Sequence, residues 1–137
     1  MADGCHGEFF ILSTTGINTC HTLRRRGGAA ISIGYDGRLS GPSFAQALAR
    51  GIQSTGINVI NIGMVATPMV YFAAYHFNTG SAVMITGSHN PPDYNGIKMV
   101  IQGETLALDA IQDLKRRIDA DDFLNADGGK TGSYETR

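Results

Sequence analysis

The sequence predicts an α/β fold: a three-layer α/β/α sandwich around a mixed, mostly parallel four-stranded sheet with an antiparallel edge strand. Three observations support this. Short apolar runs rich in β-branched residues alternate with segments of helical period. The runs are too short to be helices and are bounded by turn residues. Only ten residues separate the last two runs, too few for the crossover that a parallel neighbour needs.

The predicted elements follow one another as β-α-β-α-β-β-α. Pro42 and Pro68 stand where first helical residues are expected, because the fixed φ of proline suits the first turn. The second helix is apolar almost all round, so it is expected to be well buried. The predicted strands are residues 29–34, 58–62, 82–86 and 97–101, and the predicted helices are residues 42–56, 67–77 and 106–118.

The chain of 137 residues has the size of one domain. We expect three parts: an atypical, mostly irregular leader over residues 1–28, the folded domain over residues 29–120, and a linker or tail over residues 121–137. The leader shows no sustained period of either kind. Without a helix there, one sheet face would lack its cover, and self-association through that face is expected.

Charge and composition exclude several classes of partner. Eleven Lys and Arg against twelve Asp and Glu leave a net charge of −1, which gives no footprint for nucleic acid. No secretory signal is visible, and no apolar run approaches the length of a membrane span. We therefore expect a cytoplasmic protein with free thiols at Cys5 and Cys20 and no nucleic-acid or membrane partner.

The loop between the third and fourth predicted strands carries reactive groups. Gly87 allows a sharp turn, and Ser88 presents a hydroxyl at the strand exit, a common place for a nucleophile. The proline pair 91–92 stiffens the loop, and Lys98 offers a cation or a general acid/base. This loop and the turn after Gly34 both leave carboxyl ends of strands, so we expect them at one edge of the sheet.

A serine hydrolase is one alternative for this loop. Asn90 stands where the Gly-x-Ser-x-Gly pattern has its second glycine. His89 adjoins Ser88 directly, and neighbouring side chains in an extended loop point apart, which disfavours a Ser-His dyad. Labelling of Ser88 by a fluorophosphonate would support this alternative.

The run of residues 86–98, TGSHNPPDYNGIK, closely resembles the phosphoserine loop of the α-D-phosphohexomutase family, the phosphomannomutases and phosphoglucomutases. Residues 36–42 resemble the Gly-Arg-Asp-x-Arg turn of that family, although Tyr35 stands where the family has arginine. Residues 63–68 resemble its Gly-x-x-x-Thr-Pro step. The resemblance covers residues 29–120 and implies the N-terminal domain I of such an isomerase. Residues 121–137 would then lead toward a missing second domain.

The resemblance implies a phosphotransferase mechanism in carbohydrate metabolism. Ser88 would carry a phosphoryl group and exchange it with a hexose phosphate, so that hexose 1-phosphate and hexose 6-phosphate interconvert through hexose 1,6-bisphosphate, the activator and intermediate. The implied catalytic residues are Ser88, Lys98 and His89, and the implied phosphate- or substrate-binding residues are Gly87, Asn90 and Arg38.

The resemblance also implies Mg²⁺, which would touch the phosphate on Ser88. Its three carboxylate ligands come from the family's Asp-Gly-Asp-Gly-Asp-Arg loop, a string that this sequence lacks. The expected partners are therefore a hexose phosphate and the missing mutase domains, and we expect this chain to be inactive alone. The alternative is a non-enzymatic phosphate-binding or interaction module that retains the fold.

Overall fold

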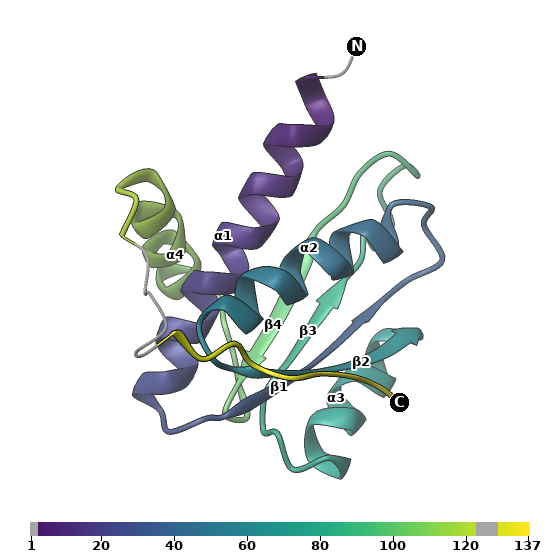
Figure 1. Ribbon diagram of the computed structural model, residues 1–137. Helices are drawn as coiled ribbons and strands as arrows, with labels where there is room; N and C mark the ends of the chain where they lie inside the picture. Colours follow the sequence, from purple (N-terminus) through teal and green to yellow (C-terminus); the bar gives the residue numbers. More distant parts are fainter. Residues whose placement is uncertain (1–2, 123–128) are drawn as a thin grey trace.

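The computed structural model describes residues 3–122 and 129–137, with side chains described from residue 13 onward. The chain forms an α/β/α sandwich, which confirms the predicted fold class (Figure 1). No helix in the described part of the chain combines the length and apolarity that crossing a bilayer requires. The elements are α1 (Asp3–Arg25), β1 (Ala30–Tyr35), α2 (Gly41–Ser54), β2 (Asn58–Met64), α3 (Thr67–His76), β3 (Ala82–Ile85), β4 (Ile97–Ile101), β5 (Glu104–Thr105), α4 (Asp109–Asp119) and β6 (Tyr134–Thr136).

The sheet has the strand order β5-β4-β3-β1-β2-β6. Strand β1 is parallel to β2 and β3, and β4 returns antiparallel to β3, as the short connection predicted. The sheet contains six strands where the sequence predicted four. The short strand β5 extends the antiparallel edge, and β6, from the predicted tail, lies parallel to β2 at the other edge.

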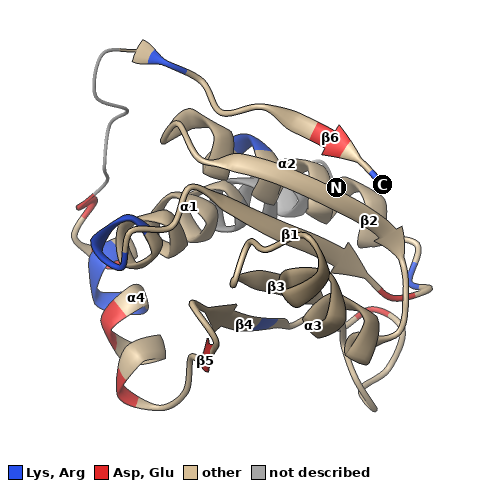
Figure 2. Ribbon diagram, turned by 90° about the horizontal axis from the view of Figure 1, so that it is seen from below, with Lys and Arg blue, Asp and Glu red and all other residues tan. Residues whose placement is uncertain are grey.

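Two apolar clusters lie on opposite faces of this sheet. Alternation along β3 divides its side chains, so that Val83 and Ile85 belong to the larger cluster and Ala82 and Met84 to the smaller one. The larger cluster joins the sheet to α1, α2 and α4, whereas the smaller one joins it to α3. Figure 2 shows the sheet between these two layers.

The prediction of a mostly irregular leader is wrong, because residues Asp3–Arg25 form helix α1. Threonines and glycines obscure its period in the sequence, and contacts with distant elements supply what local propensity lacks. Cys20 and Leu23 are fully buried in the larger cluster, and the Thr19 hydroxyl lies 3.3 Å from the Met99 sulfur on β4. Both sheet faces therefore carry helices, which overturns the expected uncovered face.

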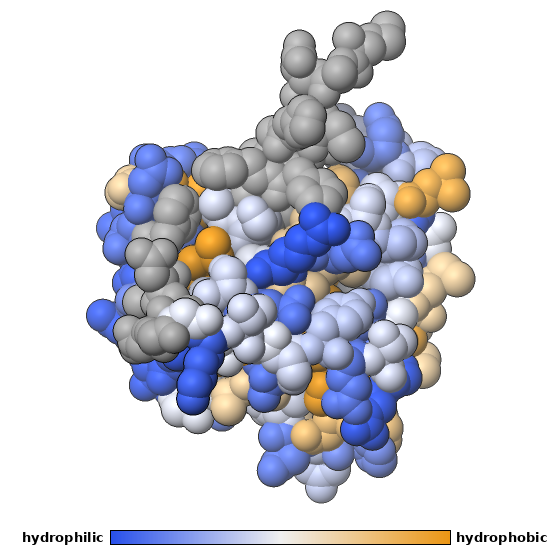
Figure 3. Space-filling model, in the orientation of Figure 1, coloured by the Kyte–Doolittle hydropathy of each residue, from blue (hydrophilic) through white to orange (hydrophobic). Residues whose placement is uncertain are grey.

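Helix α3 is less buried than its composition predicted. Val70, Ala73 and Ala74 are buried, but Phe72 is 62% exposed and Tyr75 is 85% exposed. A single helix on a sheet can turn only one side toward it, so the apolar side chains of its other side face outward. On the face of the molecule shown in Figure 3, hydrophilic side chains predominate and apolar ones form small separate patches.

Candidate functional site

The candidate site lies where β1 and β3 end. These strands are parallel neighbours with Tyr35 opposite Ile85, so the loops that follow them leave the sheet side by side. The Asp36 N–H donates to the Ile85 carbonyl at 3.1 Å and extends the strand pairing into the first loop. The expectation that both loops lie at one edge of the sheet is confirmed.

Ser88 follows β3 in a left-handed backbone conformation, with φ of 53°. Its N–H donates to the hydroxyl oxygen of Thr86 at 2.9 Å, which fixes the backbone of the turn. The residue is exposed, and its own hydroxyl makes no hydrogen bond within residues 3–122 and 129–137. The backbone at Ser88 is thus held while its nucleophilic atom remains accessible.

Asp36 binds three hydrogen-bond donors from the two loops. The Thr86 hydroxyl donates to its Oδ2 at 2.8 Å, and the Arg38 backbone N–H donates to its Oδ1 at 3.1 Å. Arg38 Nε also donates to Oδ2 at 3.1 Å. Burial raises the pKa of the Asp36 carboxyl, but the hydrogen bonds from Thr86 and Arg38 outweigh burial and lower this pKa below its ordinary value of 3.8.

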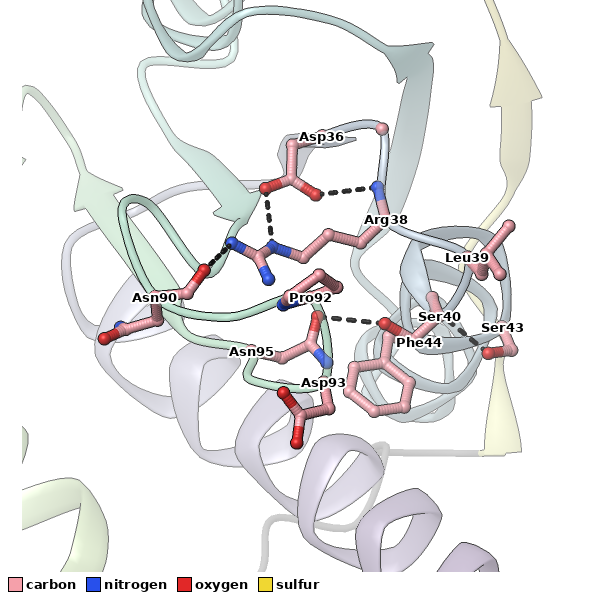
Figure 4. Close-up of a pocket in the computed structure, with 11 residues that line it drawn as sticks. Asp36, Arg38, Leu39, Ser40, Ser43, Phe44, Asn90, Pro92, Asp93 and Asn95 are labelled. Carbon is pink, nitrogen blue, oxygen red and sulfur yellow. Dashed lines mark hydrogen bonds and ion pairs between the residues drawn. The ribbon is translucent and has the colours of Figure 1, made fainter.

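Arg38 connects the first loop to the second (Figure 4). Its Nη2 donates to the carbonyls of Ser88, at 3.2 Å, and Asn90, at 2.9 Å, and its Nη1 donates to the carbonyl of Pro91. The guanidinium lies against Gly87, where any Cβ would overlap it. Gly87 is therefore required for this close approach, whereas the left-handed backbone of the turn lies at Ser88.

Lys98 and His89 make no such contacts. Lys98 pairs with Met84 across β3 and β4, and alternation with buried Met99 places Lys98 on the α3 face of the sheet, exposed. His89 is also exposed. In the described ranges, neither side chain forms a hydrogen bond or an ion pair. Asp36, Arg38 and Thr86 are among the residues that join the two loops instead.

An open cavity of about 640 Å³ lies between this loop and the start of α2. Arg38, Phe44 and Asn90 are among the residues that line it, and the Ser40 hydroxyl donates to Asn95 Oδ1 at 3.0 Å beside it. Its volume lies in the range of small-molecule sites. Ser88, His89 and Lys98 do not belong to its lining.

Sequence reasoning did not select Asp36 or Thr86 as site residues, although both lie in the two stretches that carry the family resemblance. The signal was their position: each directly follows an apolar strand at the carboxyl edge of the sheet. Both act on the loop through hydrogen bonds, and a linear sequence does not show such contacts.

A magnesium cage does not fit the described part of this chain. No three His, Cys, Asp or Glu side chains come together within it. The carboxylate nearest to Ser88 in the hydrogen-bond network, Asp36, already accepts from Thr86 and Arg38. Ligands for Mg²⁺ would have to come from outside this set of residues.

Comparison with protein families gives one match, over residues 9–125, to the family described as phosphoglucomutase/phosphomannomutase, alpha/beta/alpha domain I. The match begins within α1, so it extends beyond the resemblance recognised over residues 29–120.

Individual relatives agree with the family match. The chain is 57% identical over 108 residues to a phosphoglucomutase of Neisseria meningitidis serogroup B, covering 79% of this chain and 23% of that protein. It is 48% identical over 103 residues to a phosphomannomutase/phosphoglucomutase of Pseudomonas aeruginosa, covering 75% and 22%. A crystal structure of a phosphoglucomutase/phosphomannomutase family protein from Burkholderia thailandensis superposes with a TM-score of 0.83 at 40% identity, covering 92% and 28%. The chain thus spans less than a third of each.

Proposed function

Because this chain belongs to the phosphoglucomutase/phosphomannomutase family, as its α/β/α domain I, we propose that Ser88 is the residue that carries the phosphoryl group in a hexose phosphate mutase. One observation carries the proposal. Ser88 is exposed in the loop after β3 and its hydroxyl is not hydrogen-bonded among the described residues, while Thr86 and Arg38 hold the backbone around it. A hydroxyl fixed in this way needs little reordering before it accepts or donates a phosphoryl group.

The proposed reaction has two transfers. Phosphoserine at position 88 gives its phosphoryl group to the free 1- or 6-hydroxyl of a hexose monophosphate, whose proton is released, and hexose 1,6-bisphosphate forms. After the bisphosphate turns over, its other phosphate returns to Ser88 Oγ, and the sugar oxygen that loses it takes up a proton. Ser88 ends as it began, and the phosphate has moved between positions 1 and 6.

The neighbouring groups have proposed roles consistent with their positions. Lys98, on the strand beside β3, assists proton transfer at the sugar hydroxyl. His89 and Asn90, exposed next to Ser88, shape the space around the phosphate, and Gly87 allows the chain to turn beneath it. A bound Mg²⁺ would supply positive charge beside the phosphate, with ligands from other domains.

The remaining domains of the relatives are proposed as partners that complete the site. The chain spans 23% of the Neisseria meningitidis relative, and transition-state stabilisation in phosphoryl transfer depends on charges positioned around the substrate. We therefore expect negligible turnover of glucose 1-phosphate to glucose 6-phosphate by this chain alone, even with added Mg²⁺. Clear turnover in a coupled assay would contradict this expectation.

Phosphopeptide mass spectrometry tests the role of Ser88 directly. The chain is incubated with glucose 1,6-bisphosphate and then with hexose monophosphate. Without the other domains each transfer is expected to be slow, so long incubations at high chain concentration follow single transfers that do not register as turnover. We expect phosphate on Ser88 that the second sugar removes, none in Ser88→Ala, and the wild-type result in the control Ser133→Ala, whose serine is exposed near the C-terminal end of the chain. Phosphate that stays after the chase would favour a phosphate-binding module, and labelling by a fluorophosphonate would favour a hydrolase.

A further inference from the structure

Most N–H donors of the Arg38 guanidinium already have hydrogen-bond acceptors in the two loops. Its Nε–H donates to Asp36, its Nη2 to the carbonyls of Ser88 and Asn90, and its Nη1 to the carbonyl of Pro91. A guanidinium has five N–H donors in a fixed plane. Four of them have protein acceptors, so one remains.

The buried position of the Arg38 guanidinium further limits the hydrogen bonds that it can offer to a phosphate. The Arg38 side chain is only 11% exposed, and its guanidinium lies against Gly87, with no room for a Cβ between them. Phosphate is normally bound by arginine through two parallel N–H groups. A phosphoryl group on Ser88 could gain at most one N–H from Arg38 unless the loop gave up its own hydrogen bonds.

We propose that Arg38 is a positioning residue that clamps the Ser88 loop by its backbone carbonyls, and that it does not serve to balance the charge of the phosphate. Three carbonyls, those of Ser88, Asn90 and Pro91, converge on this one cation. Because these carbonyls point toward the guanidinium, the loop backbone bends around Arg38 and the Ser88 side chain remains exposed to solvent. The clamp also helps hold Ser88 at φ of 53°, a conformation that a serine does not favour by itself. The inference rests on the proposed role of Ser88.

One substitution distinguishes the two possible roles of Arg38, clamping the loop and balancing the charge of the phosphate. Arg38→Lys keeps the positive charge but lacks the planar fork, so a clamp fails and a charge-balancing group largely persists. Arg38→Ala removes both, and methylguanidinium added to that variant restores a planar fork in the space left behind. The control is Arg116→Lys, at an exposed position on α4 where the arginine is ion-paired to Asp113 one turn away.

Amide hydrogen exchange reports on the clamp without any reaction. The N–H groups of Ser88, Asn90 and Tyr94 are all hydrogen-bonded within the loop. We expect them to exchange roughly 10- to 100-fold faster in Arg38→Lys and Arg38→Ala, the range that loss of a charged hydrogen bond implies. Methylguanidinium should slow exchange again in Arg38→Ala. Wild-type exchange rates in Arg38→Lys would overturn the proposal.

Phosphate uptake on Ser88 from glucose 1,6-bisphosphate is the second measurement. If Arg38 acts as a clamp, Arg38→Lys loses phosphate uptake about as fully as Arg38→Ala does, and methylguanidinium restores phosphate uptake to Arg38→Ala. Uptake in Arg38→Lys equal to wild type overturns the clamp. If the wild-type chain takes up no phosphate, the proposed function fails, while the exchange measurement still decides the role of Arg38.

The wild-type chain supplies a measurement for the case in which the variants do not fold. A clamped guanidinium has hindered rotation about its Cζ–Nη bonds and slowly exchanging protons, so NMR should resolve separate Nη–H signals for Arg38. Averaged, rapidly exchanging signals like those of free arginine would overturn the proposal.

Discussion

The hydroxyl of Thr86 donates to Oδ2 of Asp36 at 2.8 Å. The Thr86 hydroxyl oxygen also accepts the N–H of Ser88 at 2.9 Å, so Thr86 links the turn after β1 to the turn after β3. The Thr86 hydroxyl thus donates to the loop after β1 and accepts from the loop after β3. The backbone conformation at Ser88 therefore depends on Thr86 and, through it, on Asp36.

The first prediction concerns this hydroxyl. Thr86→Val preserves shape but leaves the partly buried Ser88 N–H without its acceptor, and we expect a loss of about 1–3 kcal/mol in the free energy of unfolding. Phosphate uptake on Ser88 should fall with it. Urea unfolding and phosphopeptide analysis measure the two effects. Thr86→Ser keeps the hydroxyl and serves as the control; equal losses in both variants would contradict the prediction.

The second prediction concerns acid. Burial raises the pKa of Asp36, yet the hydrogen bonds from Thr86 and Arg38 lower it below 3.8 overall. A carboxyl group whose pKa is lower in the folded state stabilises the fold above its unfolded pKa, and this contribution disappears as the pH falls through the folded value. Wild type should therefore lose more stability than Asp36→Asn as pH drops below about 4. Parallel acid profiles in urea titrations would contradict it.

The third prediction concerns the crossing of α1 and α2. A Cβ at Gly51 would overlap the backbone carbonyl of Ser13, so the helices touch through their main chains. Helix propensity alone predicts that Gly51→Ala stabilises the protein by about 1 kcal/mol. The steric overlap predicts the opposite sign, a loss of about 1–3 kcal/mol. Thermal unfolding decides between them, with Gln46→Ala at an exposed position of α2 as the control.

The fourth prediction concerns Cys20. Burial raises the pKa of its thiol to about 11, although a hydrogen bond with Thr55 and the charge of Arg24 partly oppose this. In a Cys5→Ser background, we expect the native thiol to react with a disulfide reagent at neutral pH about 100-fold more slowly than in urea, because its thiolate fraction is lower by that factor. Equal rates would show that Cys20 is not buried in the larger apolar cluster.

The fifth prediction concerns α3. Phe72 is 62% exposed and Val70 is fully buried, although they lie two residues apart on the same helix. Phe72→Ser should change the free energy of unfolding by less than about 0.5 kcal/mol, whereas Val70→Ala should lower it by about 1–3 kcal/mol. Urea titration of both variants measures this difference. Similar losses would mean that the exposed side of α3 is covered in solution.

The sequence predicted the strands and the Ser88 loop well because their signals are local. Short β-branched runs, the prolines that begin α2 and α3, and the glycine and prolines of the loop act within a few residues. Helix α1 was missed because its signal is not local. Gly16 marks its contact with α2 and buried Thr19 its contact with Met99 on β4, and both residues resemble an irregular segment when the helix is considered alone.

The role of Arg38 illustrates the same limit at the site. The family resemblance implied that Arg38 binds the phosphate. Only folding shows that its donors face the carbonyls of Ser88, Asn90 and Pro91.

The sequence by itself determined the order of β1, α2, β2, α3, β3, β4 and α4 and the residue types of the loop after β3, because periodicity and turn residues are properties of short segments. The tertiary structure alone decided that α1 is a helix and that Asp36, Thr86 and Arg38 hold the backbone at Ser88. Those features depend on contacts between residues far apart in the sequence. Thr86 and Asp36, for example, lie 50 positions apart and meet only when the sheet brings β1 and β3 together.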